Sequence, residues 1–197
     1  MELLLSFLKT LPEYNIVLDA LRASECAAVT GIGQINRNHM IAALHGDTDR
    51  PLVIICQDDL AAKRLCQELK AFLGVDCPVL PSRELTLYDS AVVSRGWEQK
   101  RLRQLYELST GKTRLQIMSW DALSQRTVPP EVLRKAAFTL EVGKEYPLDS
   151  LLTLLAQAGY SRCGMVEGPG QFAVRGGILD VYSPAAEQPV RADFFGD

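Results

Sequence analysis

The run PLVIICQ at residues 51–57 is the feature that most restricts the fold of this chain. Its consecutive aliphatic residues, several of them β-branched, are typical of a strand that is buried on both faces of a parallel sheet. A helical pattern follows, with a cap expected at Asp58 or Asp59 and an end at Gly74. Short strand patterns at CPVLP and RLQIMSW alternate with further helical patterns. This alternation predicts an α/β domain with a parallel sheet.

The first 50 residues are expected to form helices and one further strand. Apolar residues near helical spacing predict a helical region over residues 1–24, which Pro12 divides in two. The run CAAVT at residues 26–30 predicts a short strand, and the turn GIGQ after it leads into a helical pattern that ends at Leu44. A strand, a glycine-rich turn and a helix form the context of a phosphate-binding P-loop.

The glycine-rich turn lacks most of the P-loop pattern GxxxxGK[ST]. Gly33 fits this pattern, but Ala28 stands at the position of its first glycine. Gln34 replaces the lysine that contacts phosphates, and Ile35 replaces the hydroxyl residue that holds Mg²⁺. Only the backbone amides remain to attract an anion weakly. We therefore predict a degenerate, inactive phosphate loop of a helicase-like domain at Thr30, Gly31, Gly33, Gln34 and Ile35.

The pattern changes at Val128, which is followed by two prolines. FTLEVGKEY predicts a strand and LDSLLTLLAQAG a helix, and the strand patterns SRCGMV, FAVRGGILDVY and VRADFF follow. One helix followed by an antiparallel meander predicts a small α+β domain. We therefore divide the chain into a first domain of residues 1–127 and a second of residues 128–197. The second domain is expected to be truncated, because a strand-like pattern runs almost to residue 197.

Composition excludes several classes of protein. A net charge of -3 and a pI near 5.5 argue against a domain built mainly to hold duplex DNA. The five cysteines form no CxxC pair and only two histidines are present, which predicts a reducing cytoplasmic location and no metal site. The start MELLLSFLKTLPEY lacks the features of a signal peptide, and no apolar stretch reaches membrane-spanning length. We expect neither export nor a membrane partner.

Two arginines of the second domain are predicted to share one face of its sheet. If SRCGMV and QFAVRG form an antiparallel hairpin that turns at residues 167–170, Arg162 lies directly opposite Arg175. The other face then carries the expected core residues Cys163, Met165, Phe172 and Val174. Like charges in directly opposed positions are mildly destabilising, so the stability of the hairpin does not explain the pair.

The arginine pair has two interpretations. Arg presents a rigid fork of donors to carboxylates, so the pair is suited to an acidic partner. Alternatively, both side chains are solvated, beside Glu167 or Asp180.

Farther along, a β-bulge is expected at Gly176-Gly177. Its extra residue shifts the register so that Leu179 and Val181 face the core and Asp180 faces outward.

Several segments resemble one bacterial family. The loop VTGIGQ, the segment LPSRELTLYD and the stretches MVEGPGQFAVRGGILDVYSP and PVRADFFGD resemble the transcription-repair coupling factors (Mfd). The resemblance spans nearly the whole chain and is to their N-terminal region, which is similar to the repair protein UvrB but has lost the Walker residues. It implies that the second domain binds UvrA and that Arg162 and Arg175 contact it. A third arginine of that contact set is Ala173 here.

The resemblance also implies a role for the complete protein. That protein recognises RNA polymerase stalled at a DNA lesion, removes it with downstream translocase domains that use ATP and magnesium, and recruits UvrA for nucleotide excision repair. This chain is then expected to be no enzyme and to need no cofactor. Its partners are UvrA, the downstream domains of the same protein and, through the complete protein, RNA polymerase and DNA.

Three alternatives remain open. UvrB itself and an active helicase-like enzyme both require the lysine and hydroxyl residue that Gln34 and Ile35 replace. A regulatory platform that clamps the downstream translocase domains would bind no partner alone.

A basic cluster follows the LPSRELTLYD segment, at Arg95, Lys100, Arg101 and Arg103. It is interpreted as a solvated helix face with interleaved glutamates, and a contact with DNA or with downstream domains is the alternative.

Overall fold

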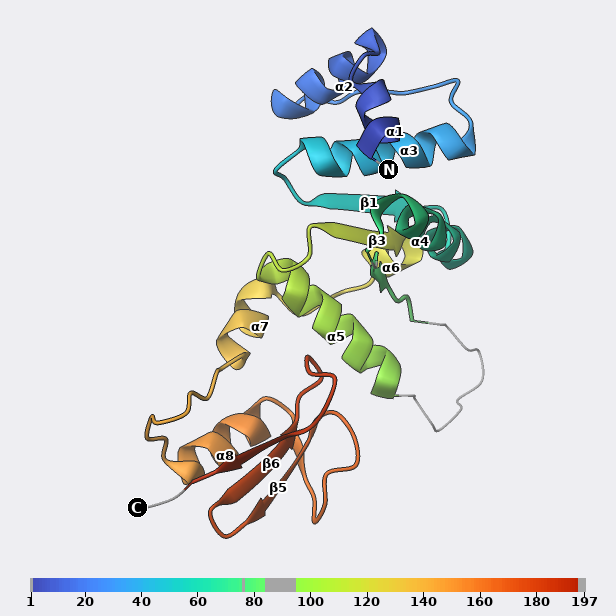
Figure 1. Cartoon of the computed structure of the whole chain (residues 1–197). Helices are drawn as coiled ribbons and strands as arrows, with labels where there is room; N and C mark the ends of the chain where they lie inside the picture. The colour runs from blue at the N-terminus through green and yellow to red at the C-terminus, as the bar shows by residue number, and fades with distance from the viewer. Residues whose placement is uncertain (1, 76, 84–94, 195–197) are drawn as a thin grey trace, which may run out of the picture. The chain divides into compact units, whose positions relative to one another are not determined.

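The computed structural model describes residues 2–75, 77–83 and 95–194 (Figure 1). The chain divides into two units, one of Met1–Ser82 with Thr113–Gln125 and one of Arg83–Lys112 with Arg126–Asp197. The second unit therefore takes in the helix after residue 94, which the sequence-based division at residue 128 placed in the first domain. Most of the LPSRELTLYD segment lies outside the described residues.

The first unit is built on a three-stranded parallel sheet in the order β1-β3-β2, as the α/β pattern predicts. Its strands are β1 (Leu52–Cys56), β2 (Val79–Leu80) and β3 (Leu115–Ser119). Its helices are α1 (Glu2–Leu8), α2 (Pro12–Arg22), α3 (Gln34–Asp47), α4 (Asp59–Leu73) and α6 (Trp120–Ser124). The break between α1 and α2 falls before Pro12, as predicted.

Helix α4 forms where its caps predict. The backbone N–H of Ala61 donates to the Asp58 side chain at 2.7 Å, and Gly74 ends the helix in the left-handed conformation with φ 68°. The apolar face of α4 packs on one face of the sheet, where Leu69 and Ile117 are fully buried in the same cluster. This core holds the first unit together.

Two predictions for the first unit are wrong. Residues 26–30 form no strand but an exposed, irregular segment. Strand β1 is also not buried on both faces, since Val53 and Ile55 are 47% and 50% exposed. The strand lies at the edge of the sheet, and the core packs only against its Ile54 side. Apolar residues on both faces of a strand thus do not ensure two covered faces.

The second unit holds a four-stranded sheet in the order β4-β5-β6-β7. Its strands are β4 (Ser161–Arg162), β5 (Gln171–Arg175), β6 (Ile178–Tyr182) and β7 (Val190–Asp193). Its helices are α5 (Arg95–Ser109), α7 (Pro130–Ala136) and α8 (Leu148–Gln157). Strands β5, β6 and β7 form the predicted antiparallel meander. The strand expected at FTLEVGKEY is absent, because residues 137–147 are irregular.

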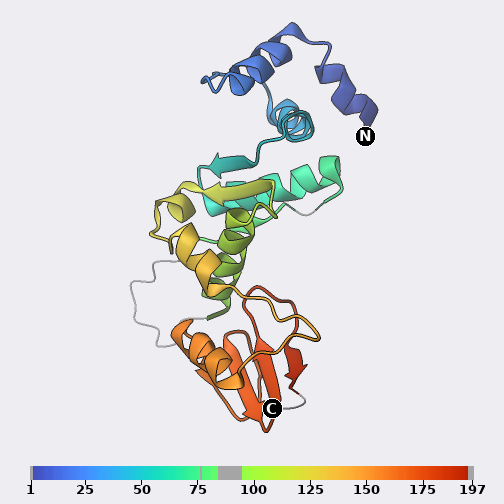
Figure 2. The same ribbon diagram turned by 90° about the vertical axis from the view of Figure 1, so that its left-hand side faces the viewer.

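Helix α8 lies along one face of this sheet in both ribbon views (Figure 1, Figure 2). Leu151 and Leu155 of α8 are buried in one cluster with Phe172 of β5 and Leu179 of β6. The i, i+4 spacing of the two leucines places both on the helix face that meets the strands. This core fixes which side chains of the sheet point toward α8 and which point away.

Candidate functional site

Strand β4 pairs with β5 in parallel, so the predicted antiparallel hairpin is wrong. Ser161 is in register with Gln171, and Arg162 with Phe172. Register partners have their side chains on the same face, so Arg162 lies on the face that α8 covers. Arg175 lies three residues after Phe172 and therefore on the opposite face. The two arginines are not opposed across a hairpin.

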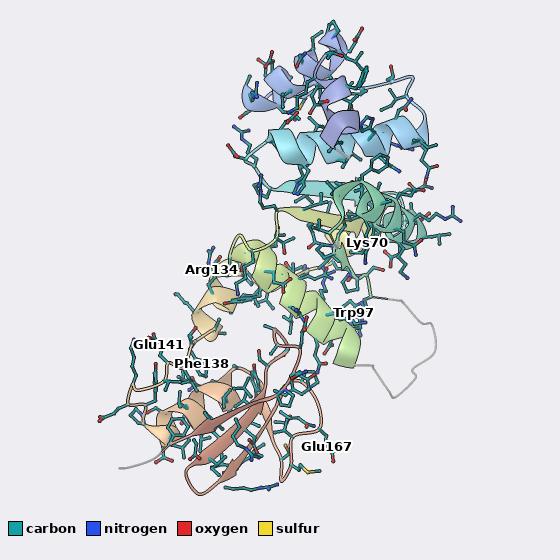
Figure 3. All side chains as sticks on the ribbon, in the orientation of Figure 1. Lys70, Trp97, Arg134, Phe138, Glu141 and Glu167 are labelled. Atoms are coloured by element: carbon teal, nitrogen blue, oxygen red, sulfur yellow. The ribbon has the colours of Figure 1, made fainter. Side chains whose placement is uncertain are left out.

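The loop of residues 163–170 explains why the hairpin does not form. The side-chain oxygen of Gln171 accepts hydrogen bonds from the backbone N–H groups of Glu167 at 2.8 Å and Gly168 at 3.1 Å. The N–H of Ser161 donates to the Gly170 carbonyl oxygen at 2.9 Å, which brings the end of the loop back to the start of β4. Figure 3 shows Glu167 on this loop, on the other side of the strands from α8. The loop thereby lets β5 run beside β4 in the same direction.

Arg175 ends β5 and helps to hold this loop. Its Nη2 donates to the carbonyl oxygen of Gly164 at 2.8 Å. The guanidinium is also close enough to Asp180 to help lower the pKa of that carboxyl. Arg175 is exposed and has further N–H donors, so it can still contact a partner while it holds Gly164.

An ion pair of a carboxylate and a guanidinium lies on the same face of the sheet as Arg175. Asp180 of β6 is in register with Arg191 of β7, whose Nε and Nη2 donate to its two carboxylate oxygens at 2.6 and 2.9 Å. The hydrogen bonds and charge of Arg191 lower the pKa of Asp180, and the charge of Arg175 adds to the effect. Asp180 is therefore hydrogen-bonded to Arg191. Arg175 affects Asp180 only through the electrostatic effect of its charge.

The predicted core face of the hairpin is correct in part. Phe172 is buried and Val174 packs beside it, but Cys163 is only half-buried and Met165 is 63% exposed. Because β4 ends at Arg162, the alternation of faces does not continue to Met165.

The predicted bulge at Gly176-Gly177 is a two-residue hairpin turn, with Arg175 in register with Ile178. Gly176 adopts φ 60°, which suits the turn to glycine. Leu179 and Val181 pack in the core, as predicted.

Arg162 borders a shallow pocket that the sequence does not reveal. The Arg162 side chain is exposed and makes no hydrogen bond or ion pair within the described residues. The pocket has a volume of about 400 Å³ and is lined by Leu152, Thr153, Ala156, Tyr160, Arg162 and Phe172. Its residues come from a helix and two strands, so only the tertiary structure brings them together.

The predicted degenerate phosphate loop is not confirmed. Helix α3 begins at Gln34 after Gly33, and Gly31 has φ 76°, but no strand precedes this turn in the described part of the chain. Thr30 and Ile35 are exposed. The Nε2 group of Gln34 donates to Glu68 Oε1 of α4 at 2.9 Å, and the Asn38 side chain donates to the same carboxylate. The first turn of α3 is thus tied to a carboxylate of its own chain.

Two arginines of the predicted basic cluster on α5 interact with other side chains of the chain. Arg101 is buried with its guanidinium 5.9 Å from the centre of the Trp97 ring, and burial lowers its pKa. Arg103 pairs with Glu107 at 3.1 Å, as expected for interleaved charges, and with Glu187 at 3.3 Å. The burial of Arg101 shows that the predicted solvated face is wrong for this residue. The side chain of Arg95 lies outside the described part.

Two further findings bear on the site. Across residues 2–75, 77–83 and 95–194, no group of three histidine, cysteine or acidic side chains is placed to hold a metal ion. None of the helices in those ranges combines the length and apolar character needed to cross a membrane.

Comparisons with known proteins show what the last 60 residues and the chain as a whole resemble. Residues 138–197 match the family model of the UvrB interaction domain. A transcription-repair-coupling factor of Myxococcus xanthus is 37% identical over 190 residues, covering 92% of this chain and 16% of its own length. Factors of the same name from Bacillus subtilis and Escherichia coli are 27% and 33% identical, covering 96% and 75% of this chain and 16% and 13% of their own lengths. The chain therefore spans about a sixth of these relatives or less, and it belongs to the transcription-repair-coupling factor family.

Proposed function

We propose that this chain recruits UvrA for transcription-coupled nucleotide excision repair. The observation that carries the proposal is that the match to the UvrB interaction domain, residues 138–197, contains α8, the four-stranded sheet and both predicted contact arginines. A domain that UvrB-like proteins share is suited to bind a partner that they share. The chain then works as a binding module.

Arg162 and Arg175 are the proposed contacts with UvrA. Both side chains are exposed, and each guanidinium offers N–H donors that no described residue of the chain uses. Carboxylates of the partner would accept these donors in pairs. Because the two side chains lie on opposite faces, a partner that contacts both must touch both faces of the sheet.

We also propose that this chain hydrolyses no ATP and needs no cofactor. Gln34 and Ile35 cannot supply the cation and the Mg²⁺ ligand of a phosphate loop. The position of the missing lysine also lies beside a negative charge, since Gln34 donates a hydrogen bond to Glu68. ATP, magnesium, DNA and RNA polymerase would engage the much longer remainder of the complete protein.

A second candidate function is a platform for the downstream domains of the same protein. It is favoured by the edge strand of the first unit, where Val53 and Ile55 are half-exposed on the face away from α4. Apolar side chains on an uncovered sheet face can pack against another domain. Such a platform would not bind UvrA alone.

Calorimetric titration of this chain with UvrA separates the two candidates. Binding by the wild type is expected, with weakening on the order of tenfold or more for Arg162→Glu, as for other charged contacts at the centre of an interface. Arg175→Glu should also weaken binding, and circular dichroism should show that both variants keep their fold.

Arg126→Glu reverses a charge at an exposed position in the same unit and serves as the matched control. Binding that neither reversal at residues 162 and 175 weakens would overturn the assignment of the arginines. No binding by the wild type would overturn recruitment and favour the platform.

A further inference from the structure

The pocket beside Arg162 offers more than a charge to a partner. Phe172 is buried and Leu152 packs against the same core, so these two side chains form its apolar floor. Thr153 and Ala156 of α8 are exposed and form part of its rim. A volume of about 400 Å³ is ample for one large apolar side chain.

Arg162 supplies the only charge among the side chains that line the pocket. Its register with Phe172 places the guanidinium on the α8 face, where the apolar floor lies. Its side chain has no partner within the described residues, so its fork of donors is available. Once a partner covers this apolar surface, screening by water weakens and a charge pair with Arg162 gains strength.

These features select a partner by its chemistry. The positive, otherwise apolar lining complements a segment that carries an aliphatic or aromatic side chain beside a carboxylate. A nucleic acid phosphate would satisfy the guanidinium but would leave Leu152 and Phe172 uncovered. The net charge of -3 also disfavours binding to a polyanion. A protein segment therefore fits better than DNA.

We infer that the pocket receives an aliphatic or aromatic side chain of UvrA, and that a neighbouring carboxylate of UvrA pairs with Arg162. This inference rests on the proposed function and adds the kind of segment that is recognised. An apolar anchor in a pocket next to an arginine is the arrangement found at the centres of strong interfaces. Arg162 and Phe172 thus contribute to one contact, the first as a donor and the second as the floor.

The test fills the pocket without changing its charge. Ala156→Phe adds an aromatic ring at the exposed rim, and Gln157→Phe adds the same ring at the next exposed residue, which does not line the pocket. The complete 197-residue chain and each variant are titrated with UvrA by calorimetry, and thermal unfolding checks that each variant is folded. Ala156→Phe should weaken binding on the order of tenfold or more, as expected when a central contact is blocked. Gln157→Phe should bind like the wild type.

Arg162→Lys adds a second readout, because it keeps the charge but loses the fork that pairs with a carboxylate. We expect it to weaken binding less than Arg162→Glu does. Wild-type affinity in Ala156→Phe, together with weakened binding in Arg162→Glu, would overturn the pocket contact and leave recruitment intact.

Failure of the wild type to bind UvrA would overturn recruitment and the pocket contact together. Duplex DNA is the remaining arm of the test. If the chain bound DNA at low salt and Arg162→Glu abolished that binding, the assignment of the pocket to a protein partner would be overturned.

Discussion

Arg162 and Arg175 lie on opposite faces of the second sheet and have different surroundings. Arg162 borders an open pocket and makes no side-chain bond within the described residues. Arg175 donates to the carbonyl oxygen of Gly164 at 2.8 Å and so holds the loop that leads from β4 to β5. Substitutions of the two arginines should therefore have different effects on the free protein.

Arg175→Ala should loosen the loop of residues 163–170. The lost hydrogen bond is worth about 1 kcal/mol, so exchange of the Glu167 and Gly168 amide protons should be about fivefold faster. Hydrogen exchange followed by NMR measures these rates. Arg162→Ala, which removes no such bond, is the control and should leave them unchanged. Equal rates in the wild type and Arg175→Ala would show that the arginine does not hold the loop.

Gly177→Ala should destabilise the second unit. A Cβ atom at this position would lie 2.6 Å from the backbone carbonyl oxygen of Phe194. The backbone cannot move freely, because the N–H of Phe194 donates to the Gly177 carbonyl oxygen. We expect a loss of roughly 1–3 kcal/mol in the free energy of unfolding, as for other overpacked sites. Urea unfolding measures it.

Gly168→Ala is the control for that measurement. Its added Cβ would have no atom within 4 Å. The same unfolding midpoint for both variants would argue against a close approach at Gly177.

The pair of Asp180 and Arg191 should stabilise the protein at neutral pH and lose its effect in acid. Because Arg191 lowers the pKa of Asp180 below its ordinary value of 3.8, the carboxylate form is favoured in the folded state. The contribution is present above about pH 4 and is lost as the pH falls through the lowered pKa. Asp180→Asn should thus flatten the dependence of the melting temperature on pH below this value. Asp121→Asn in the first unit is the control, and an unchanged slope in Asp180→Asn would contradict the prediction.

His45 should remain neutral at pH values where an ordinary histidine is charged. Burial lowers its pKa below 6.5, and the charge of Arg114 lowers it further. Stability from the neutral imidazole is complete above about pH 6.5 and declines as the pH falls toward the lowered pKa. NMR titration of the ring protons measures the midpoint, and His39→Gln assigns the signals because the chain has two histidines. A midpoint at or above 6.5 would contradict this placement.

Mg-ATP should not bind to this chain. The double substitution of Gln34→Lys with Ile35→Thr restores two P-loop residues, yet we expect no binding by this variant either. The new ammonium group would lie beside the carboxylate of Glu68, which accepts from Gln34 and Asn38 in the wild type, and would pair with it instead of a phosphate. Titration with a fluorescent ATP analogue tests both proteins. Saturable binding by the wild type would contradict the prediction that the phosphate loop is inactive.

Local signals predict most elements of this fold correctly. The cap at Asp58 and the left-handed Gly74 bound α4 because both act within a few residues. The pairing of β4 is not predictable from alternation, since a side-chain amide, that of Gln171, shapes the loop that decides it. Exposure of Val53 likewise depends on which helices cover a sheet face, and the apolar pattern of one strand does not contain that information.

In the candidate site, too, local features can be recognised from the sequence and tertiary ones cannot. The sequence and the resemblance single out Arg162 and Arg175, because residue type and spacing are local. Their assignment to one face is wrong, since it depended on the direction of β4. The pocket is a tertiary feature that joins α8 to two strands, so no sequence window contains it.

Because α5 belongs to the second unit, the chain passes between the two units more than once. The polypeptide leaves the first unit after Ser82, returns at Thr113 and leaves again after Gln125, so three peptide links join the units. A protease that cut one link would produce two polypeptides, and at least one unit would then contain segments from both of them. A polypeptide of residues 126–197 would also lack α5, and with it the hydrogen bond from Gln99 to the Pro169 carbonyl oxygen and the ion pair of Arg103 with Glu187. A minimal fragment that keeps the native loops of the sheet must therefore begin before α5.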